Sequence, residues 1–499
     1  MNTIKPLLLL TTLCLTTLIF AQTDSEIAEE TVNKNEIEGH IYFLADDALK
    51  GRATGSPELK IAASYLANTL RGYGVKPNPK NGTYYQYLDL HHYFLSEDIE
   101  LSFGGQNYPE VVAFDVDAIN SEEDAIYLNY GLEEDYKGKD VKGKIIIVKA
   151  GTPENNELRP ALRSRAPKRE LAIQNGARGL IEVGSFDTAL WPRFKHAFEE
   201  RMSLTESEKE PLPLFLWVQT SPENLAKLGN ESIPIKIKST GIQNEILKTQ
   251  NVIGVLEGTD TKLKEEYIIY SAHYDHIGIG TPDAKGDSIY NGARDNAIGT
   301  TAVLSMAENL SKYPTKRSAL FILFTGEELG LLGSRYYVEN PVIPLHQMIY
   351  CFNTDGGGYN NTSLATIAGL NRTTAKNKMI KGAKTFGLKA LDIDEVAPEE
   401  GLFDRSDNVS FAKVGIPAPT YSTGFDAFDD EINKYYHQAG DEADSLDFDY
   451  LLKFYQGYVL SGRLIANDPE TPFWIKGDKY EAAANVLYEI VPEASPIKN

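Results

Sequence analysis

Three apolar stretches of the chain each end in side chains that could bind a metal ion. The motifs at these ends are HYDH at 273–276, TGEE at 325–328 and NTD at 353–355. In an open parallel sheet, ligands bind beyond the carboxyl ends of the strands, so we expect these motifs to lie close together. The same residue types recur in GARDN at 292–296 and in YYHQ at 435–438.

None of these motifs is specific by itself. A His-x-Asp is usually a surface or core pair, and a Glu-Glu pair usually begins a helix, where acids suit the helix dipole. An aspartate after a strand is usually a turn or cap residue, and a single late histidine more often makes ordinary hydrogen bonds. The combination is more informative, because the chain has only 8 histidines and His273 and His437 both fall where ligands are expected.

The residue types favour zinc, which imidazole and carboxylate groups can bind without a thiolate. The five candidate ligands are His273, Asp295, Glu328, Asp355 and His437. One open catalytic zinc needs fewer than five ligands. A bridging carboxylate would therefore let this set hold two zinc ions per chain, each with room for solvent.

The charges and the remaining acids of these motifs indicate hydrolysis. Two divalent ions would exceed the charge of the three ligand carboxylates by one, which would favour a bridging hydroxide as nucleophile. Glu327 lies next to a ligand but is not needed as one, so we predict that it is the general base. Asp275, two residues after His273, is predicted to orient that imidazole through its other ring nitrogen.

Taken together, the motifs resemble those of the co-catalytic di-zinc exopeptidases of the bacterial leucyl aminopeptidase type. That family, metallopeptidase family twenty-eight, also holds glutamate carboxypeptidase and glutaminyl cyclase relatives. The similar stretches are AHYDHIG (272–278), GARDNAIGT (292–300), FTGEELGLLGS (324–334), NTD (353–355) and YHQAGDEADS (436–445). The resemblance covers roughly residues 36–100 and 245–465.

The resemblance also implies how the ligands divide between the two ions. One zinc would be bound by His273 and Asp355, the other by Glu328 and His437, and Asp295 would bridge them. None of the five ligand positions is missing from the sequence.

Three further residues receive catalytic roles from the same resemblance. Glu327 would be the base and Asp275 the orienting residue. Tyr436 matches a tyrosine that in some members helps to stabilise the tetrahedral oxyanion, although a packed aromatic is an equally good interpretation.

The sequence departs from the family pattern at two places. Arg294 stands before the bridging aspartate, where an acid or a small polar residue is usual, and could alter substrate preference. Gly356-Gly357 follow Asp355 where a larger apolar residue is common, which puts the shape of the pocket in question.

Hydrophobic patterning after Asn251 predicts an α/β protein. The stretch 319–324 is apolar throughout, as expected of a strand buried on both faces of a parallel sheet. Helices are expected over 300–312 and 329–339. The resemblance implies a zinc-exopeptidase (phosphorylase/hydrolase-like) fold, with a mixed, largely parallel sheet flanked by helices.

Residues 111–244 have a different pattern of short strands and glycine turns. KGKIIIVKAG and NGARGLIEV within this segment resemble a protease-associated domain, a common insert in exported members of the family. The segment also holds a basic cluster of Arg159, Arg163, Arg165, Lys168 and Arg169. This cluster is either a solvated face or a patch that steers acidic peptides toward a neighbouring site.

The N-terminal segment predicts export. Lys5, an apolar run over 7–20 and Ala21 form the pattern of a secretory signal peptide, with an uncleaved anchor as the alternative. Lipidation of Cys14 is disfavoured, because the bulky Leu13 precedes it. Periplasmic and fully secreted locations both remain open.

These observations predict five segments. They are a signal peptide (1–21), the N-terminal part of a peptidase domain (24–110), a protease-associated insert (111–244), the catalytic part (245–470) and a C-terminal tail (471–499).

Composition limits the possible partners. The chain of 499 residues has a formal net charge of −22, which argues against a nucleic-acid partner. It also lacks a second long apolar stretch, so we expect no stable membrane insertion. The sequence leaves the oligomeric state open.

The predicted function is that of an exported zinc aminopeptidase, in which Glu327 activates a metal-bridging water to hydrolyse N-terminal residues from peptides. A carboxypeptidase that grips a C-terminal carboxylate is the alternative, and it would need arginines around the pocket. Arg294 and Arg405 are the candidates. A metal-free binding module on the same fold is disfavoured by the complete ligand set.

Overall fold

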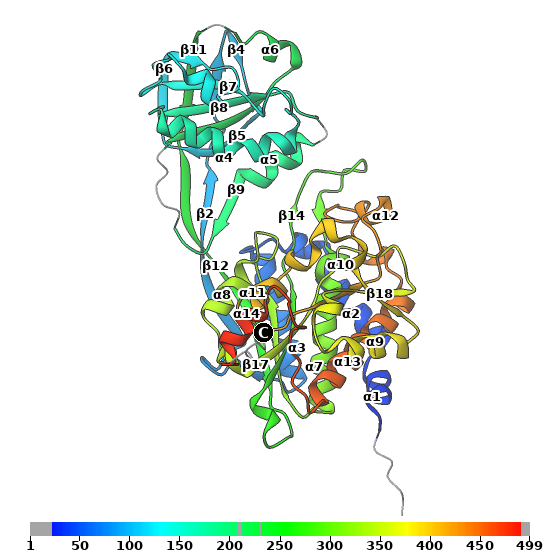
Figure 1. Ribbon diagram of the computed structural model, residues 1–499. Helices are drawn as coiled ribbons and strands as arrows, with labels where there is room; N and C mark the ends of the chain where they lie inside the picture. Colours follow the sequence, from blue (N-terminus) through cyan, green and yellow to red (C-terminus); the bar gives the residue numbers. More distant parts are fainter. Residues whose placement is uncertain (1–21, 189, 207–211, 230, 491–499) are drawn as a thin grey trace, which may run out of the picture.

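The computed structural model describes residues 22–188, 190–206, 212–229 and 231–490. The predicted signal peptide, residues 1–21, lies outside the described residues. The described chain forms two bodies joined by long strands (Figure 1). No helix in these ranges combines the length and the apolar character that a membrane span requires.

The lower body in Figure 1 is built around a 10-stranded mixed sheet, in accord with the predicted α/β class. The strand order is β19-β18-β20-β17-β13-β16-β12-β2-β9, with β1 beside β12. β13 is parallel to its neighbours β16 and β17, whereas β12 is antiparallel to β16 and β2. The strands are β1 (Lys76–Pro77), β2 (Tyr85–Leu95), β9 (Glu200–Ser203), β12 (Ile242–Leu256), β13 (Tyr267–His273), β16 (Ser318–Phe324), β17 (Met348–Thr354), β18 (Leu364–Ala368), β19 (Lys389–Asp392) and β20 (Thr420–Thr423).

Separate apolar cores cover the two faces of this sheet, because successive side chains of a strand point to opposite faces. In β16, Phe321 and Leu323 belong to one core, whereas Leu320 and Ile322 belong to the other. This burial on both faces explains why the stretch 319–324 contains no polar residue.

Helices cover both cores. The first is covered by α1 (Asp24–Thr31), α2 (Lys34–Leu44), α3 (Pro57–Gly72), α7 (Ile298–Lys312), α9 (Lys376–Thr385) and α13 (Phe448–Asn467). The second is covered by α8 (Leu332–Glu339), α10 (Ile393–Val396), α11 (Asn408–Lys413), α12 (Asp430–Asn433) and α14 (Glu481–Leu487). The predicted C-terminal tail thus contributes α14 and the buried Trp474, whose indole N–H donates to the Gly415 carbonyl at 2.9 Å.

The upper body contains an 8-stranded sheet in the order β4-β3-β11-β6-β7-β8-β10-β5. Its strands are β3 (Glu100–Phe103), β4 (Gln106–Asn107), β5 (Val111–Val116), β6 (Ile119–Tyr127), β7 (Ile145–Lys149), β8 (Gly179–Gly184), β10 (Leu214–Gln219) and β11 (Ser232–Ser239). β3 and β4 precede the boundary predicted at residue 111, yet they belong to this sheet because β3 pairs with β11. The short helices α5 (Trp191–Glu199) and α6 (Pro222–Ala226) also belong to this body.

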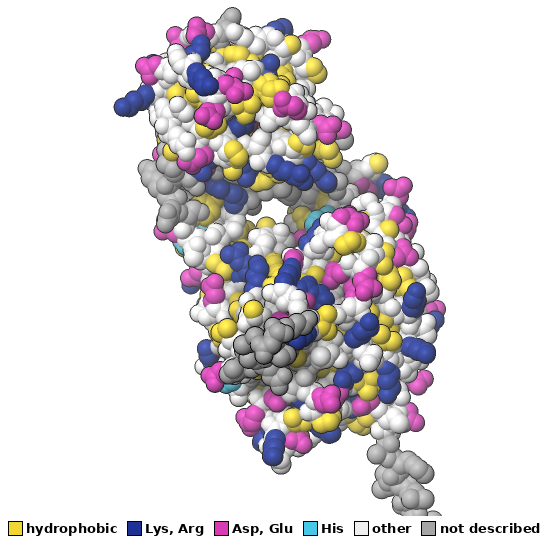
Figure 2. All heavy atoms as spheres, viewed as in Figure 1, with side chains coloured by type: hydrophobic (Ala, Val, Ile, Leu, Met, Phe, Trp, Pro, Cys, Tyr) yellow, Lys and Arg dark blue, Asp and Glu magenta, His cyan; other side chains and the backbone are white. Residues whose placement is uncertain are grey.

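The basic cluster of the inserted segment lies on α4 (Leu158–Gln174), on the side of the upper body that faces the lower one (Figure 1). Its members have different environments. Lys168 is buried in an ion pair with a glutamate of β8, whereas Arg159 and Arg163 are exposed. Figure 2 shows lysine and arginine side chains along this edge of the upper body. The cluster is therefore not a single solvated face.

Paired strands connect the two bodies. β2 and β12 pair from Tyr85 opposite Val252 to Leu95 opposite Ile242, and β9 adds a third strand beside β2. The inserted segment therefore enters and leaves the lower body through one hydrogen-bonded ribbon.

Candidate metal centre

The five candidate ligands meet at the carboxyl end of the lower sheet. His273 is the last residue of β13, Glu328 follows β16 and Asp355 follows β17. These strands are parallel neighbours, so the residues that follow them emerge at one edge of the sheet. Asp295 precedes α7, and His437 lies in the loop after α12.

Asp295 lies between the two imidazoles. Its Oδ1 is 3.3 Å from His273 Nε2, and its Oδ2 is 3.3 Å from His437 Nε2. Each of these nitrogens faces a second carboxylate: His273 Nε2 is 3.2 Å from Asp355 Oδ1, and His437 Nε2 is 3.2 Å from Glu328 Oε2. The side chains therefore form two groups that share Asp295.

The spacing of these atoms suits zinc. Two ligand atoms of one tetrahedral zinc lie about 3.3 Å apart when each is about 2 Å from the metal. The four imidazole–carboxylate separations of this centre, 3.2 and 3.3 Å, match that value.

The electrostatic field of the centre also favours cations. Burial opposes a positive charge on His437, but Glu328 and Asp295 outweigh it and raise the pKa of this imidazole to about 10. Burial likewise opposes a charge on His273, and neighbouring carboxylates, Asp355 first, raise its pKa well above the ordinary value. A metal ion would experience the same field, so donor types, spacing and field all fit a divalent cation.

Glu327 borders the same pocket but takes no part in the two groups around Asp295. One of its carboxylate oxygens comes within 4.8 Å of ligand atoms of His273 and Asp355. Burial is the largest cause that raises the pKa of Glu327 well above its ordinary value. The carboxyl group therefore holds a proton more firmly than a solvated glutamate does.

Asp275 orients its neighbours in a way that differs from the prediction. The Nδ1 atom of His273 faces the main-chain oxygen of Asp275 at 3.1 Å, whereas the carboxylate is 3.9 Å away. The carboxylate instead accepts hydrogen bonds from the Glu327 N–H at 3.2 Å and the Thr54 hydroxyl at 2.9 Å. Asp275 thus contacts both the imidazole and the main chain of the predicted base.

Tyr436 lines the pocket and also packs on a candidate ligand. Its ring is stacked on His437 with ring centres 4.0 Å apart, and it contacts Phe428 edge-on. A Cβ atom at Gly357 would lie 2.4 Å from Tyr436 Cδ2, so a larger residue there would displace this ring. The position of Tyr436 therefore explains why a glycine stands at 357, where the family usually has a larger residue.

Arg294, the other departure from the family pattern, is not among the side chains that line the pocket. It is buried and forms an ion pair with Asp441, with 3.2 Å between NH1 and Oδ1. Arg405, in contrast, lines the pocket and lies 3.8 Å from Glu400.

Two residues without a predicted role contact the candidate ligands. His276 Nδ1 is 2.7 Å from Glu328 Oε1, and Asp441 accepts a hydrogen bond from the Asp295 N–H at 3.2 Å. His276 belongs to the HYDH motif, but the sequence predicts no role for it. Asp441 is 146 positions from Asp295, and no spacing rule connects the two.

Apolar side chains form the wall of the pocket next to the centre. They are Ala368, Ile393, Leu402, Phe425 and Phe428. Thr366, Ser406 and Ser422 add hydroxyl groups. The pocket therefore suits an apolar side chain beside the metal ligands.

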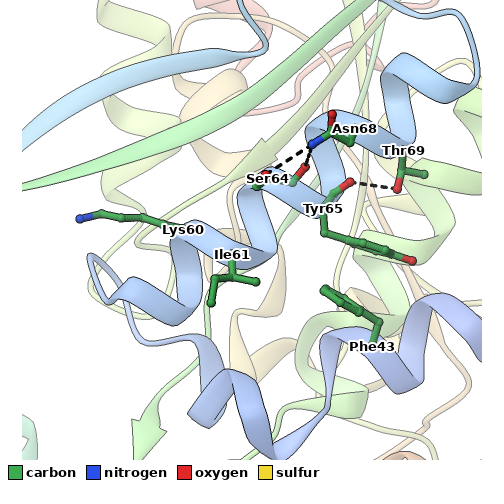
Figure 3. Close-up of a pocket in the computed structure, with 7 residues that line it drawn as sticks. All are labelled: Phe43, Lys60, Ile61, Ser64, Tyr65, Asn68 and Thr69. Atoms are coloured by element: carbon green, nitrogen blue, oxygen red, sulfur yellow. Dashed lines mark hydrogen bonds between the residues drawn. The ribbon is translucent and has the colours of Figure 1, made fainter.

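A second hollow lies between α2 and α3, away from these residues. It is lined by Phe43, Lys60, Ile61, Ser64, Tyr65, Asn68 and Thr69 (Figure 3). Phe43 and Tyr65 stack with ring centres 3.8 Å apart. No acid or histidine lines this hollow, so it offers no metal-binding chemistry.

Comparison with known proteins indicates the class of protein. The relatives of the chain define the class as metallo-exopeptidase. Residues 251–459 match the model of Peptidase family M28, so this part of the chain is similar to that family.

Individual relatives point the same way. Aminopeptidase YwaD of Bacillus subtilis (strain 168) is 28% identical over 200 residues, which are 40% of each chain. The probable leucine aminopeptidase 2 of Aspergillus oryzae is 23% identical over 364 residues, 69% of this chain and 67% of that protein. The chain thus spans less than half of the length of the Bacillus relative.

Solved structures share the fold over most of the chain. The aminopeptidase from Aneurinibacillus sp. strain AM-1 has a TM-score of 0.60 and 21% identity, and the match covers 90% of this chain and 97% of that one. This similarity confirms the predicted fold class.

Proposed function

We propose that this protein is a zinc-dependent aminopeptidase, which removes N-terminal residues from peptides. The observation that carries the proposal is the sharing of Asp295 by two imidazoles, each with a further carboxylate of its own. The aminopeptidase names of the Bacillus and Aspergillus relatives support the same function.

We assign one zinc to His273 and Asp355 and a second to Glu328 and His437, with Asp295 shared. This assignment follows the two groups that the side chains form. Bound zinc would supply Lewis acidity, which polarises the scissile carbonyl and makes a water molecule more acidic.

The chain's own residues would move the proton and support the base. Glu327 accepts the proton of the attacking water and delivers it to the leaving amine, a task for which its raised pKa is suited. Asp275 holds the main chain of Glu327 through the 3.2 Å hydrogen bond. Tyr436, on the wall of the pocket, would donate a hydrogen bond to the developing oxyanion.

The surroundings of the pocket favour an aminopeptidase over a carboxypeptidase. A C-terminal carboxylate is best gripped by guanidinium groups. Arg294 is occupied by Asp441 and Ser445, which leaves Arg405 on the pocket wall. The apolar wall instead suits the side chain of an N-terminal residue such as leucine.

Two further parts of the proposal concern the rest of the chain. We propose that the upper body is a protease-associated domain, in view of its position as an insert in the peptidase sheet. We also propose that residues 1–21 direct export, as the sequence pattern indicates.

The test combines zinc content with hydrolysis of aminoacyl anilides. Glu327→Gln should retain two zinc ions per chain and lose about 100- to 10,000-fold in kcat, because a general base typically contributes that much. Glu339→Gln, an exposed position on α8, is the matched control and should keep its activity.

Each outcome bears on the proposal. Two zinc ions without aminoacyl hydrolysis would contradict the aminopeptidase and direct the assay to C-terminal glutamyl peptides. A chain that binds no zinc even when zinc is supplied would overturn the metal centre itself.

A further inference from the structure

A buried ion pair joins two of the segments that supply candidate ligands. Asp295 lies in the segment 292–297 before α7, and His437 lies in the loop between α12 and α13. Arg294 from the first segment pairs with Asp441 from the second at 3.2 Å. The two residues are 3% and 0% exposed, so this contact is shielded from water.

Asp441 also fixes the main chain at the shared carboxylate. Its two carboxylate oxygens each accept the Arg294 N–H at 3.0 Å, and its Oδ2 accepts the Asp295 N–H at 3.2 Å. The main-chain oxygen of Asp441 accepts the Ala293 N–H at 3.2 Å. Three consecutive N–H groups of one ligand segment are thus held by one residue of the other.

The guanidinium of Arg294 makes the remaining contacts of this junction. It donates to the Ser445 hydroxyl at 2.7 Å and to the Ser445 carbonyl at 3.1 Å. It also stacks over Tyr435, with its central carbon 3.6 Å from the ring centre. Tyr435 is two residues before His437, so the arginine touches the ligand loop on both sides of that histidine.

We propose that Arg294 and Asp441 are positioning residues that set the geometry of Asp295 relative to His437, and thereby the affinity of the metal site that these two side chains share. The inference rests on the metal centre of the proposed function. An arginine suits this junction because its planar group can donate to two acceptors and stack at once, which a lysine cannot do.

A positioning role and a direct effect of charge predict opposite changes in zinc affinity when Arg294 is replaced. If Arg294 acted on the metals through its positive charge alone, its removal would strengthen cation binding. If it acts by holding the two segments together, its removal weakens binding, because one buried partner is left without the other and the ligands lose their relative position. The sign of the change therefore separates the two explanations.

The experiment measures zinc affinity by competition with a chelator and records the visible absorption of the cobalt-substituted protein. Arg294→Met should weaken one of the two zinc sites about 10- to 100-fold, as loss of residues that orient metal ligands typically does. The cobalt spectrum of that site should change, whereas the other site, which shares Asp295 but not His437, should lose less affinity. Arg294→Lys should restore part of the affinity.

Arg463→Met is the matched control. Arg463 is 3% exposed, pairs with Asp24 at 2.9 Å and donates to Asn309, three turns along α7 from the metal centre. Its loss should lower the thermal stability without any change in zinc affinity or in the cobalt spectrum.

The results separate a positioning role from a purely structural one. Unchanged zinc affinity and an unchanged spectrum in Arg294→Met, or tighter zinc binding, would overturn the proposal. If Arg294→Met does not fold, Arg294→Lys and Ser445→Ala supply the same two readouts. A wild-type chain that binds two zinc ions without aminoacyl hydrolysis would refute the proposed function and leave this affinity comparison intact.

Discussion

The candidate ligand Glu328 contacts two imidazoles, those of His437 and His276. His276 is not one of the five candidate ligands. His276 is buried, and its Nδ1 lies 2.7 Å from Glu328 Oε1, while the other oxygen of Glu328 faces His437. The two oxygens of this carboxylate therefore have different partners, and His276 fixes which one is free for a metal.

Replacing His276 should weaken the zinc site of Glu328 and His437. We expect His276→Ala to lower the affinity of that site about 10- to 100-fold, because such orienting contacts typically contribute this much. Chelator competition measures the change, and the exposed His346→Ala serves as control. Equal zinc affinities in both variants would contradict the role of His276.

The sequence predicts ligand candidates better than it predicts the contacts that orient them. The sequence predicted that His273, Glu328 and Asp355 lie close together, because each is found at or just after the end of a recognisable apolar strand. The direction of Arg294 could not be predicted, since its partner Asp441 is 147 positions away. A charged residue beside a ligand can point to the metals or away from them, and only the fold decides.

At the scale of elements, the buried stretches were the most predictable. ALFILF became β16, and the expected helix over 300–312 became α7 (Ile298–Lys312). Short strands such as β9 were not predictable, because their existence depends on pairing with residues more than a hundred positions away. The helix expected over 329–339 begins only at Leu332, after the loop that carries Glu327.

Asp392, at the boundary between β19 and α10, should make the stability of the fold depend on pH. Asp392 ends β19 and caps α10, and it accepts hydrogen bonds from the N–H groups of Asn371 and Asp394. Burial, its largest influence, raises the pKa of Asp392 to about 6 from 3.8. The folded state therefore binds a proton more tightly than the unfolded state, so stability decreases as pH rises from about 4 to 6.

Asp392→Asn should remove this pH dependence. Relative to the wild type, the variant should gain roughly 2 kcal/mol of unfolding free energy between pH 4 and 6.5, given about 1.4 kcal/mol per pKa unit. Denaturant unfolding at several pH values measures the difference, with the exposed Asp430→Asn as control. A wild-type-minus-variant difference that stays constant with pH would refute the argument.

At the scale of the whole molecule, the two bodies have separate apolar interiors. Of the residues that the structure describes between 96 and 241, none belongs to the two cores that cover the lower sheet. The inserted segment adds to the lower body at β9, where Met202 and Leu204 pack against a small cluster of Leu88, Leu90 and Leu332. The lower body should therefore fold without the upper one.

A variant that lacks the upper body tests this independence. Leu95 and Ile242 are cross-strand neighbours, so an Asn-Gly turn can join them in place of residues 96–241. The shortened chain should fold, bind two zinc ions and hydrolyse aminoacyl anilides at a rate comparable to that of the full chain. Its thermal stability should decrease, because this small cluster loses the cover that Met202 and Leu204 give.

Substitution of Met202 and Leu204 by serine in the full chain separates the loss of this cover from the loss of the upper body. Both variants should show a similar decrease in thermal stability, since both expose the same apolar surface. A shortened chain that folds and binds zinc but does not hydrolyse anilides would show that the upper body supplies a group to the reaction. Retained anilide hydrolysis together with altered cleavage of longer peptides would place the role of the upper body in substrate selection, because its helix α4 faces the body that carries the metal centre (Figure 1).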